Sequence, residues 1–435
     1  MELTREEEEI LGGEEGGTRQ RMMELLVGLG KVFGAERLVP VASAQVSGAS
    51  YKTIGRWGLA WLESLDAGVS VPTILNPVGM DRERWREAGI PAGFAENQEK
   101  VIAVYRRLGV RLECTCTPYE ILPVKFGEHL AWAESSAVAY ANSVIGARTN
   151  REGGPGALAA AIVGKTPCYG LHLDRERAPR LVIRVEGFAG AGPGPDHYGA
   201  LGFLAGKIAG NRVPFFRGLA GPAGSPGSGG AGAVPGRRGT PRRSRERPGG
   251  KGPLRSGIRP GPDELKAMGA AMAASGAVAL FHVEGVTPEA DRFAPETGRL
   301  EEHTISSAEV NGLMKDMPVE AVAIGCPHCS PAELGEIARL LRGRRVRKPL
   351  FVFTSRHVIG ANRRLVGEIE AAGARVYADT CMVVSPMMDG FSSVMVDSGK
   401  AFSYVPSMCG AMARIGTREQ CIAEATGGRA GTGSP

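Results

Sequence analysis

The chain has 435 residues, more than one compact core accommodates, and this length favours two or three domains. Its content of 43% hydrophobic and 23% charged residues is typical of soluble globular proteins. No apolar run reaches the roughly 18 residues of a membrane span, and the acidic start MELTREEEEIL has neither the basic nor the apolar part of a secretion signal. The sequence therefore predicts a cytoplasmic protein that does not associate with a membrane.

The net charge of +6 is unevenly distributed along the chain. Residues 221–260 contain nine basic residues and one acid, so this segment carries +8 and the rest of the chain sums to −2. Gly, Pro, Arg and Ser dominate residues 219–262, and this composition predicts a disordered insert. Translation of a GC-rich gene out of frame, or a basic arm for nucleic acid, would give the same composition. The arm is disfavoured because no aromatic residues are interleaved with the basic ones.

Residues 1–218 form an N-terminal region in which strand, polar loop and helix alternate. Helices are expected over residues 1–35, where Thr4 is a candidate N-cap. An apolar strand at 38–41 then leads towards the small-residue loop Ser47–Ser50, which precedes another helix. This alternation predicts a mostly parallel sheet.

The same order recurs further along the region. A second strand ends in the loop at Asn76-Pro77, and a strand at 110–114 ends in the loop 115–119. Residues 131–150 are expected to form a buried helix with a polar end, and 151–166 a glycine-rich turn followed by a small-residue helix.

Residues 263–425 form a C-terminal region with the same character. Strand, loop and helix repeat over 319–408, and 426–435 read as a loose tail. The sequence thus predicts an α/β fold with several three-layer domains. Ligands of such folds bind at the carboxyl ends of the strands, so functional residues are expected in the loops that follow strands.

The chain contains eight cysteines, at positions 114, 116, 168, 326, 329, 381, 409 and 421. A disulfide framework is not expected in a cytoplasmic chain. Cys116, Cys326 and Cys381 each follow a predicted strand, so their loops could converge on one iron–sulfur cluster. Their spacing matches no local cluster motif, and from the spacing alone buried thiols are the better interpretation. Cys326-Pro-His-Cys329 also leaves open a zinc site or a thioredoxin-like pair.

Other loops contain groups that suit anions. The loop Gly48-Ala49-Ser50 offers backbone N–H groups before a helix. A buried Glu134 beside Ser135 needs either a partner or a function. Lys400 could grip a carboxylate or a phosphate, although a surface role is the simpler interpretation. The candidate substrate-binding residues are Gly48, Ala49, Ser50, Asn76, Pro77, Glu134, Ser135 and Lys400, of which Lys400, Glu134 and Ser135 are also the catalytic candidates.

Several strings together resemble the aconitase X family. They include VSGASYKTIG, LNPVGMD, TCTPY, GCPHCS, DTC and the long run AWAESSAVAYANSVIGARTNREGG, and the resemblance covers about residues 3–215 and 263–425. It implies an aconitase-like fold in which α/β domains surround an iron–sulfur cluster, expected to be [4Fe-4S]. It also implies that Cys116, Cys326 and Cys381 are the cluster ligands.

The resemblance implies dehydration of a small anionic hydroxy acid. Members of the family act chiefly on (R)-5-phosphomevalonate, giving trans-anhydromevalonate 5-phosphate in a mevalonate pathway to isoprenoids, or on cis-3-hydroxy-L-proline. The opening LTREEEEIL and the lack of a fused swivelling domain favour the first substrate. They also imply a separate small subunit that completes the site and supplies a catalytic serine.

Two departures from the family pattern stand out. Gln45 occupies a position where relatives commonly have histidine, and the insert at 219–262 interrupts a region that is usually short. A function of another class, an RNA-binding regulator that uses the basic insert, is the least favoured alternative.

Overall fold

The computed structural model describes residues 1–188, 195–220 and 259–428. Most of the predicted insert, residues 221–258, and most of the predicted tail, residues 429–435, lie outside the described residues. The division into regions at 219–262 therefore stays a prediction.

Two helices begin the chain, as expected: α1 (Arg5–Gly12) and α2 (Gly17–Val32). Thr4 caps α1, because its hydroxyl accepts from the Glu7 backbone while the Glu7 carboxylate accepts from the Thr4 backbone. A two-stranded antiparallel sheet of β1 (Leu38–Pro40) and β6 (Lys165–Pro167) lies near α2. The predicted strand at 38–41 therefore pairs here, and a separate strand leads into the 47–50 loop.

That separate strand belongs to the first parallel sheet. In spatial order the sheet consists of β4 (Arg111–Cys114), β3 (Thr73–Leu75), β2 (Ala44–Val46) and β5 (Ala131–Trp132). Its helices are α3 (Tyr51–Glu63) and α4 (Ala92–Arg107), which pack on each other, and α6 (Gly154–Val163), which packs on β2 and β5. The strands are short, and their side chains are mostly buried, as expected for a parallel sheet that is covered by helices.

The segment 131–150 is only partly helical, which corrects the prediction of one helix. Residues 131–132 form β5, and α5 (Ser135–Tyr140) continues as a π-helical turn (Ala141–Ile145). Trp132 adopts an extended conformation because it pairs with Gln45 of β2, and Glu134 then caps α5.

The second parallel sheet contains β10 (Glu302–Ser306), β7 (Leu181–Glu186), β8 (Pro214–Arg217) and β9 (His282–Val283). Strands from both sides of the segment 219–262 therefore share this sheet. Two helices pack closely beside it, α7 (Pro195–Ala209) and α8 (Pro262–Gly276). A Cβ atom at Gly202 would lie only 2.3 Å from the Met268 carbonyl oxygen, so a glycine is needed for this close approach. The short helices α9 (Ala290–Phe293) and α10 (Ser307–Gly312) flank the sheet.

The third parallel sheet has five strands: β13 (Arg375–Ala378), β12 (Leu350–Thr354), β11 (Ala321–Ile324), β14 (Ser393–Val396) and β15 (Met412–Ile415). Its helices are α11 (Pro331–Leu341), α12 (Arg356–Ala361), α13 (Arg363–Ala371), α14 (Gly399–Cys409) and α15 (Arg418–Thr426). Separate apolar clusters lie on the two faces of this sheet. The predicted α/β class with mostly parallel sheets is confirmed.

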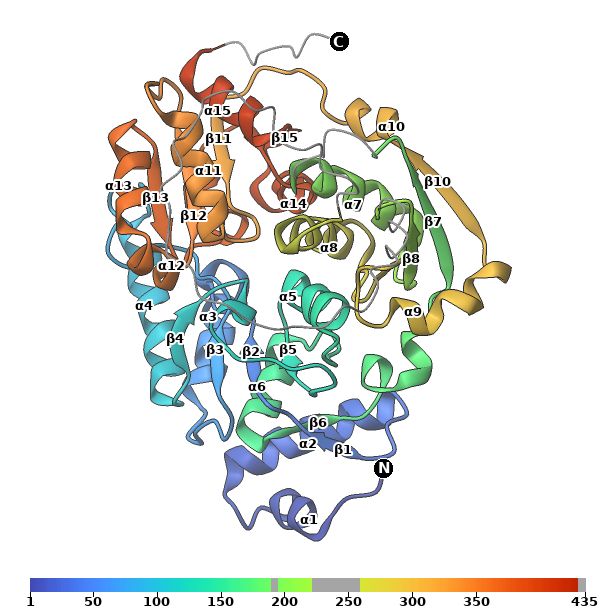
Figure 1. Cartoon of the computed structure of the whole chain (residues 1–435). Coiled ribbons are helices and arrows are strands. Elements are labelled where there is room, and N and C mark those ends of the chain that lie inside the picture. The colour runs from blue at the N-terminus through green and yellow to red at the C-terminus, as the bar shows by residue number, and fades with distance from the viewer. Residues whose placement is uncertain (189–194, 221–258, 429–435) are drawn as a thin grey trace, which may run out of the picture.

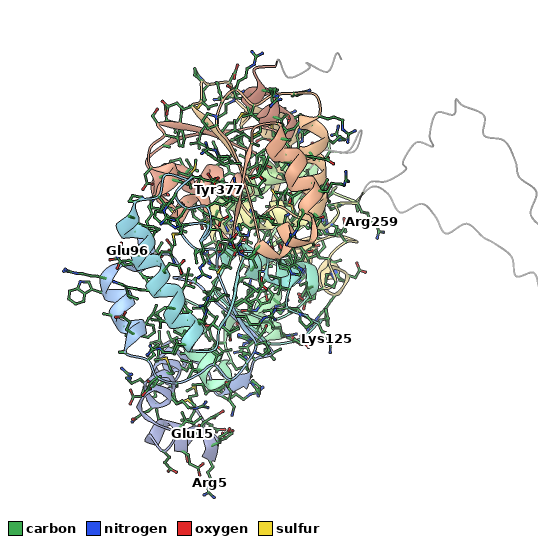
Figure 2. The ribbon with its side chains drawn as sticks, turned by 90° about the vertical axis from the view of Figure 1, so that its left-hand side faces the viewer. Arg5, Glu15, Glu96, Lys125, Arg259 and Tyr377 are labelled. Carbon is green, nitrogen blue, oxygen red and sulfur yellow. The ribbon has the colours of Figure 1, made fainter. Side chains whose placement is uncertain are left out.

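The first and third sheets meet at their carboxyl ends (Figure 1). Val78 forms a parallel bridge with Thr380, with hydrogen bonds of 2.9 Å from the Val78 N–H to the Asp379 carbonyl and 3.0 Å from the Cys381 N–H to the Val78 carbonyl. In the view of Figure 2, Tyr377 of β13 lies in the upper part of the molecule, whereas Arg5 and Glu15 lie at its lower, N-terminal end. Among the described residues, no helix combines the length and apolarity needed to cross a membrane.

Candidate active site

A cavity of about 470 Å³ lies where the carboxyl ends of the first and third sheets face each other. All the predicted site residues line it, although they come from seven different loops or helix starts. They are Gly48, Ala49, Ser50, Asn76, Pro77, Cys116, Glu134, Ser135, Cys326, Cys381 and Lys400. The structure thus brings every one of these residues together around one space.

The loop after β2 forms one wall of the cavity. Gly48 has a φ of 79°, a conformation that favours glycine, and Ser50 is the N-cap of α3. The Ser50 hydroxyl donates to the Val384 carbonyl at 2.8 Å and so joins this loop to the segment that follows β13 of the third sheet. The start of α6 lies against the same loop, because a Cβ at Gly154 would be 2.7 Å from the Ser47 carbonyl oxygen. Glycine at position 154 permits that approach.

Glu134 and Lys400 form a buried ion pair inside the cavity. Glu134 is the N-cap of α5 and accepts from the Asn76 side-chain amide at 2.7 Å, whereas Lys400 lies in the first turn of α14 and also donates to the Ser136 hydroxyl at 3.1 Å. The Asn76 Oδ1 atom is buried and has no hydrogen-bond partner among the described residues. Asn76 lines the cavity, but this buried oxygen is not exposed to it.

Electrostatics keep this pair charged. Burial alone would raise the pKa of Glu134, but the Lys400 charge and the hydrogen bonds from Lys400 and Asn76 hold that pKa below its ordinary value. Burial would lower the pKa of Lys400, but Glu134 and the nearby thiols raise it well above its ordinary value. Glu134 is therefore an anion at neutral pH and Lys400 a cation, which suits them to orient a polar substrate.

The three cysteines follow strands β4, β11 and β13 and face one end of the cavity. Cys116 and Cys326 are buried, and Cys381 is half-buried. Burial raises the pKa of all three thiols, to about 12 for Cys116, whereas the Lys400 charge lowers each of them. The Cys116 sulfur also accepts from the His328 backbone N–H at 3.1 Å, a contact that favours the thiolate.

This sulfur set fits an iron–sulfur cluster better than a single metal ion. No group of three His, Cys, Asp or Glu side chains in the described part of the chain is arranged to hold one ion. In a cluster each thiolate binds a different iron, so the three sulfur atoms need not converge on one point. Three soft thiolates around a cavity, with a cation beside them to offset the negative charge, are the expected donors for such a cluster.

The remaining cysteines lie elsewhere. Cys329, the second cysteine of the CPHC string, is buried in the core between the third sheet and α11, away from the cluster of apolar residues that contains Cys326. The zinc interpretation of CPHC finds no support, because the described residues provide no ion-binding group there. Cys114, Cys168 and Cys421 are buried thiols.

Some cavity residues were not predicted. Arg151 is exposed, lines the cavity and donates weakly to the Ala273 carbonyl at 3.5 Å; no ion pair of Arg151 occurs among the described residues. His328, which was not among the predicted site residues, also lines the cavity. Tyr404 and Met408 of α14 complete the wall. The sequence signal for Arg151 was its place in the polar run after residue 147, and that signal did not indicate a cavity.

Gln45, the departure from the family pattern, is fully buried beside the site. Its amide nitrogen donates to the Thr115 carbonyl at 2.7 Å, and its oxygen accepts from the Glu134 backbone at 3.3 Å. The side chain therefore joins the loops that carry Cys116 and Glu134, which gives it a positioning contact without access to substrate.

Comparison with known proteins agrees with this geometry. The family model described as the aconitase X first domain matches residues 1–175, the second-domain model matches 247–315 and the third-domain model matches 319–427. A crystal structure of Thermococcus kodakaraensis aconitase X in its holo form superposes with a TM-score of 0.82 at 39% identity, covering 98% of this chain and all of that one. The chain belongs to the aconitase X family, whose aconitase-like members generally carry an iron–sulfur cluster.

Two curated relatives have different activities. The phosphomevalonate dehydratase large subunit of Methanosarcina mazei is 48% identical over 99% of this chain and 98% of its own length. The cis-3-hydroxy-L-proline dehydratase of Pseudomonas aeruginosa is 32% identical over 98% of this chain but only 70% of its own length. This chain is thus similar to the first over its full length, whereas about a third of the second has no counterpart in it.

Proposed function

We propose that this chain is the large subunit of a two-component hydro-lyase that dehydrates (R)-5-phosphomevalonate to trans-anhydromevalonate 5-phosphate. The observation that carries the proposal is the 48% identity to a phosphomevalonate dehydratase large subunit over nearly the whole of both chains. The cavity supports it, since its lining combines a cysteine end with cations suited to an anionic hydroxy acid.

Cys116, Cys326 and Cys381 would hold the cluster. Three thiolates match a [4Fe-4S] cluster in which one iron has no protein thiolate. Such a cluster supplies, when bound, a Lewis acid for the hydroxyl that leaves as water. The Lys400 charge offsets part of the negative charge of the three thiolates.

The other residues of the chain bind and orient the substrate. Lys400 can hold the carboxylate next to the reacting carbons, because its ammonium group points into the cavity and has a spare donor beyond Glu134 and Ser136. Glu134 stays ionised, so it fixes Lys400 and Asn76 in place and does not act as an acid. The Ser135 hydroxyl, which donates to Glu134 at 3.4 Å, and the loop Gly48–Ser50 provide further hydrogen bonds.

Arg151 suits the phosphate group. It lines the cavity from the residues that follow β5, at the opposite edge of the first sheet from β4 and Cys116. Three strand spacings separate these edges, about 14 Å. A substrate whose hydroxyl lies at the cysteine end could therefore place a second anionic group near Arg151.

A small subunit completes the proposed enzyme. The relatives named as large subunits imply such a partner. The proton next to the substrate carboxylate would be removed by a group of that partner, since Glu134, the one carboxylate that lines the cavity in the described residues, is occupied by Lys400.

The proposal is tested by anaerobic co-expression with the small subunit and by assay of both substrates. We expect formation of trans-anhydromevalonate 5-phosphate from (R)-5-phosphomevalonate and no turnover of cis-3-hydroxy-L-proline. Turnover of hydroxyproline alone would overturn the substrate assignment in favour of the second activity of the family.

A further inference from the structure

His328 connects the three loops that carry the cavity cysteines. It lies two residues after Cys326, in the loop that follows β11. Its backbone N–H donates to the Cys116 sulfur, and its Nδ1 lies 3.2 Å from the hydroxyl of Thr115 in the same loop. Its Nε2 lies 3.0 Å from the Thr380 carbonyl oxygen, in the loop that carries Cys381. Thr115 precedes Cys116 and Thr380 precedes Cys381, so one residue contacts the neighbour of each of the other two cysteines.

The hydrogen-bond pattern fixes the tautomer of the ring. A carbonyl oxygen can only accept, so Nε2 carries the hydrogen and donates to Thr380. Nδ1 is then an acceptor, and the Thr115 hydroxyl donates to it.

The backbone carbonyl of His328 also has a polar partner. Its carbonyl oxygen accepts from the Lys266 ammonium group at 3.5 Å, which adds a contact with α8 of the second domain. All four polar groups of this buried residue therefore have partners within the chain, on three different segments. A ring in this state has no free nitrogen to act as an acid or a base.

We propose that His328 is a positioning residue that aligns Cys116, Cys326 and Cys381 for the cluster before the cluster binds. The three ligands lie far apart in the sequence, so the chain must restrict three loops independently to form one binding site. A buried imidazole with two opposed hydrogen bonds holds the Cys116 loop and the Cys381 loop at a fixed separation, and its backbone N–H favours the Cys116 thiolate. This inference rests on the proposed cluster ligands and adds the residue that orients them.

The test compares substitutions at His328 with a matched control. His282 is also buried and its Nε2 contacts a backbone carbonyl, that of Arg177, at 2.8 Å, but it lies in the second sheet. H328A removes both ring hydrogen bonds, whereas H328N and H328Q can each restore one of them. The chains are reconstituted anaerobically with iron and sulfide, and iron per chain, the electron paramagnetic resonance spectrum and the rate of bleaching in air are measured, together with unfolding of the apo-protein.

We expect H328A to bind iron roughly 10–100-fold more weakly and to bleach correspondingly faster. H328N and H328Q should be intermediate, and H282A should match the wild type in iron content, spectrum and bleaching even where its apo-protein unfolds more easily. A purely structural role of His328 would change unfolding in the same way as H282A and leave the cluster of the folded variant unchanged.

Wild-type iron content and bleaching in H328A would overturn the inference while leaving the cluster ligands in place. If H328A does not fold, the same measurements are made on H328N, H328Q and T115V. Wild-type iron content and bleaching in all three of these variants would also overturn the inference. A wild-type chain that takes up no cluster would overturn the ligand assignment and this inference with it.

Discussion

The loop 325–330 has buried ion pairs on both of its sides, but the two sides differ in the space that lies beside those pairs. The front faces the cavity of about 470 Å³, and the rear faces a space of only about 20 Å³. We call the charged residues around the rear space the rear charge cluster; they are Asp196, Lys266, Glu333, Asp397 and Arg418.

The members of the rear charge cluster are bonded mostly to one another, although Arg418 also donates to Glu336 and Asp196 Oδ1 is buried without a hydrogen-bond partner among the described residues. Arg418 donates to Glu333 at 3.0 Å and to Asp397 at 3.0 Å, and its backbone N–H donates to Asp196 at 2.8 Å. Lys266 pairs with Glu333. These residues come from α7, α8 and the elements of the third sheet, so the rear cluster joins α7 and α8 to that sheet, whereas the front keeps an open cavity and an exposed Arg151 for a ligand.

The largest effect that separates the two sides is expected from R418M. This substitution leaves carboxylates of the rear cluster buried without their cation, and such losses cost about 3–5 kcal/mol. The free energy of unfolding, measured by denaturant titration, should fall by that amount. R414M is the control: Arg414 pairs with the exposed Asp316 and with Glu424, and it should cost about 1 kcal/mol or less. Equal losses of unfolding free energy in both variants would mean that removing the cation of the rear charge cluster costs no more than removing a partly exposed one.

At the front, K400M should lower turnover strongly and also destabilise the fold, because it leaves the buried Glu134 without its cation. Removing a preorganised cation from the site lowers kcat by roughly 10²–10³-fold, about 3–4 kcal/mol in the barrier. The Lys52 side chain, which pairs with Asp389 at 2.5 Å and does not line the cavity, gives the control K52M, expected to keep wild-type kcat. A K400M enzyme with wild-type kcat would remove Lys400 from the mechanism.

A smaller effect is expected from R151Q. If Arg151 binds the phosphate, kcat/KM for (R)-5-phosphomevalonate should fall about 10–100-fold. Turnover of mevalonate, which lacks the phosphate, should be the same in R151Q as in the wild type. An equal loss for both compounds would assign Arg151 to the carboxylate or to the structure of the cavity wall.

The smallest expected effect depends on pH. Burial, opposed by Arg418 and aided by the Asp397 charge, raises the pKa of Asp196 from 3.8 to about 8. The folded state thus binds a proton that the unfolded chain releases near pH 4, so the stability from this group is complete below about pH 4 and is lost as the pH rises to about 8.

The variant D196N keeps a neutral side chain at every pH. It should unfold at nearly the wild-type urea concentration near pH 4, and its advantage over the wild type should grow as the pH rises, to about 1 kcal/mol or more at pH 8.5. A constant difference between the two proteins across this range would contradict a protonated Asp196.

The sequence predicted the cavity residues better than the shape of the fold. Strand followed by polar loop is a local pattern, so the loop of Asn76 could be found from the order of residues alone. Glu134 was noted as a buried carboxylate inside an expected helix, and Lys400 was more simply a surface residue until the family resemblance was considered. The convergence of Cys116 with Cys326 and Cys381 depends on the bridge between Val78 and Thr380, which joins two sheets and leaves no local signal. Without the resemblance to a family, spacing alone left the three cysteines as ordinary buried thiols.

Other details depended on tertiary packing. The strand β5 has two residues, too few for a periodic pattern, so the helical composition of 131–150 dominated the prediction. His328 was not among the predicted site residues, because its partners Thr115 and Thr380 come from loops that are distant in the sequence. The rear cluster was missed for the same reason, because Arg418 and Asp196 meet only in the folded chain.

The central claim is that Cys116, Cys326 and Cys381 together hold the cluster at the front of the loop. The direct measurement is iron and sulfide per chain, with the spectrum of the cluster, after anaerobic reconstitution of C116A, C326A and C381A beside C114A and C329A. The two controls lie two or three residues from a proposed ligand. We predict that each of the first three loses the cluster and that both controls keep it. Wild-type iron content in C116A, or loss of the cluster in C114A as complete as in C116A, would contradict the account.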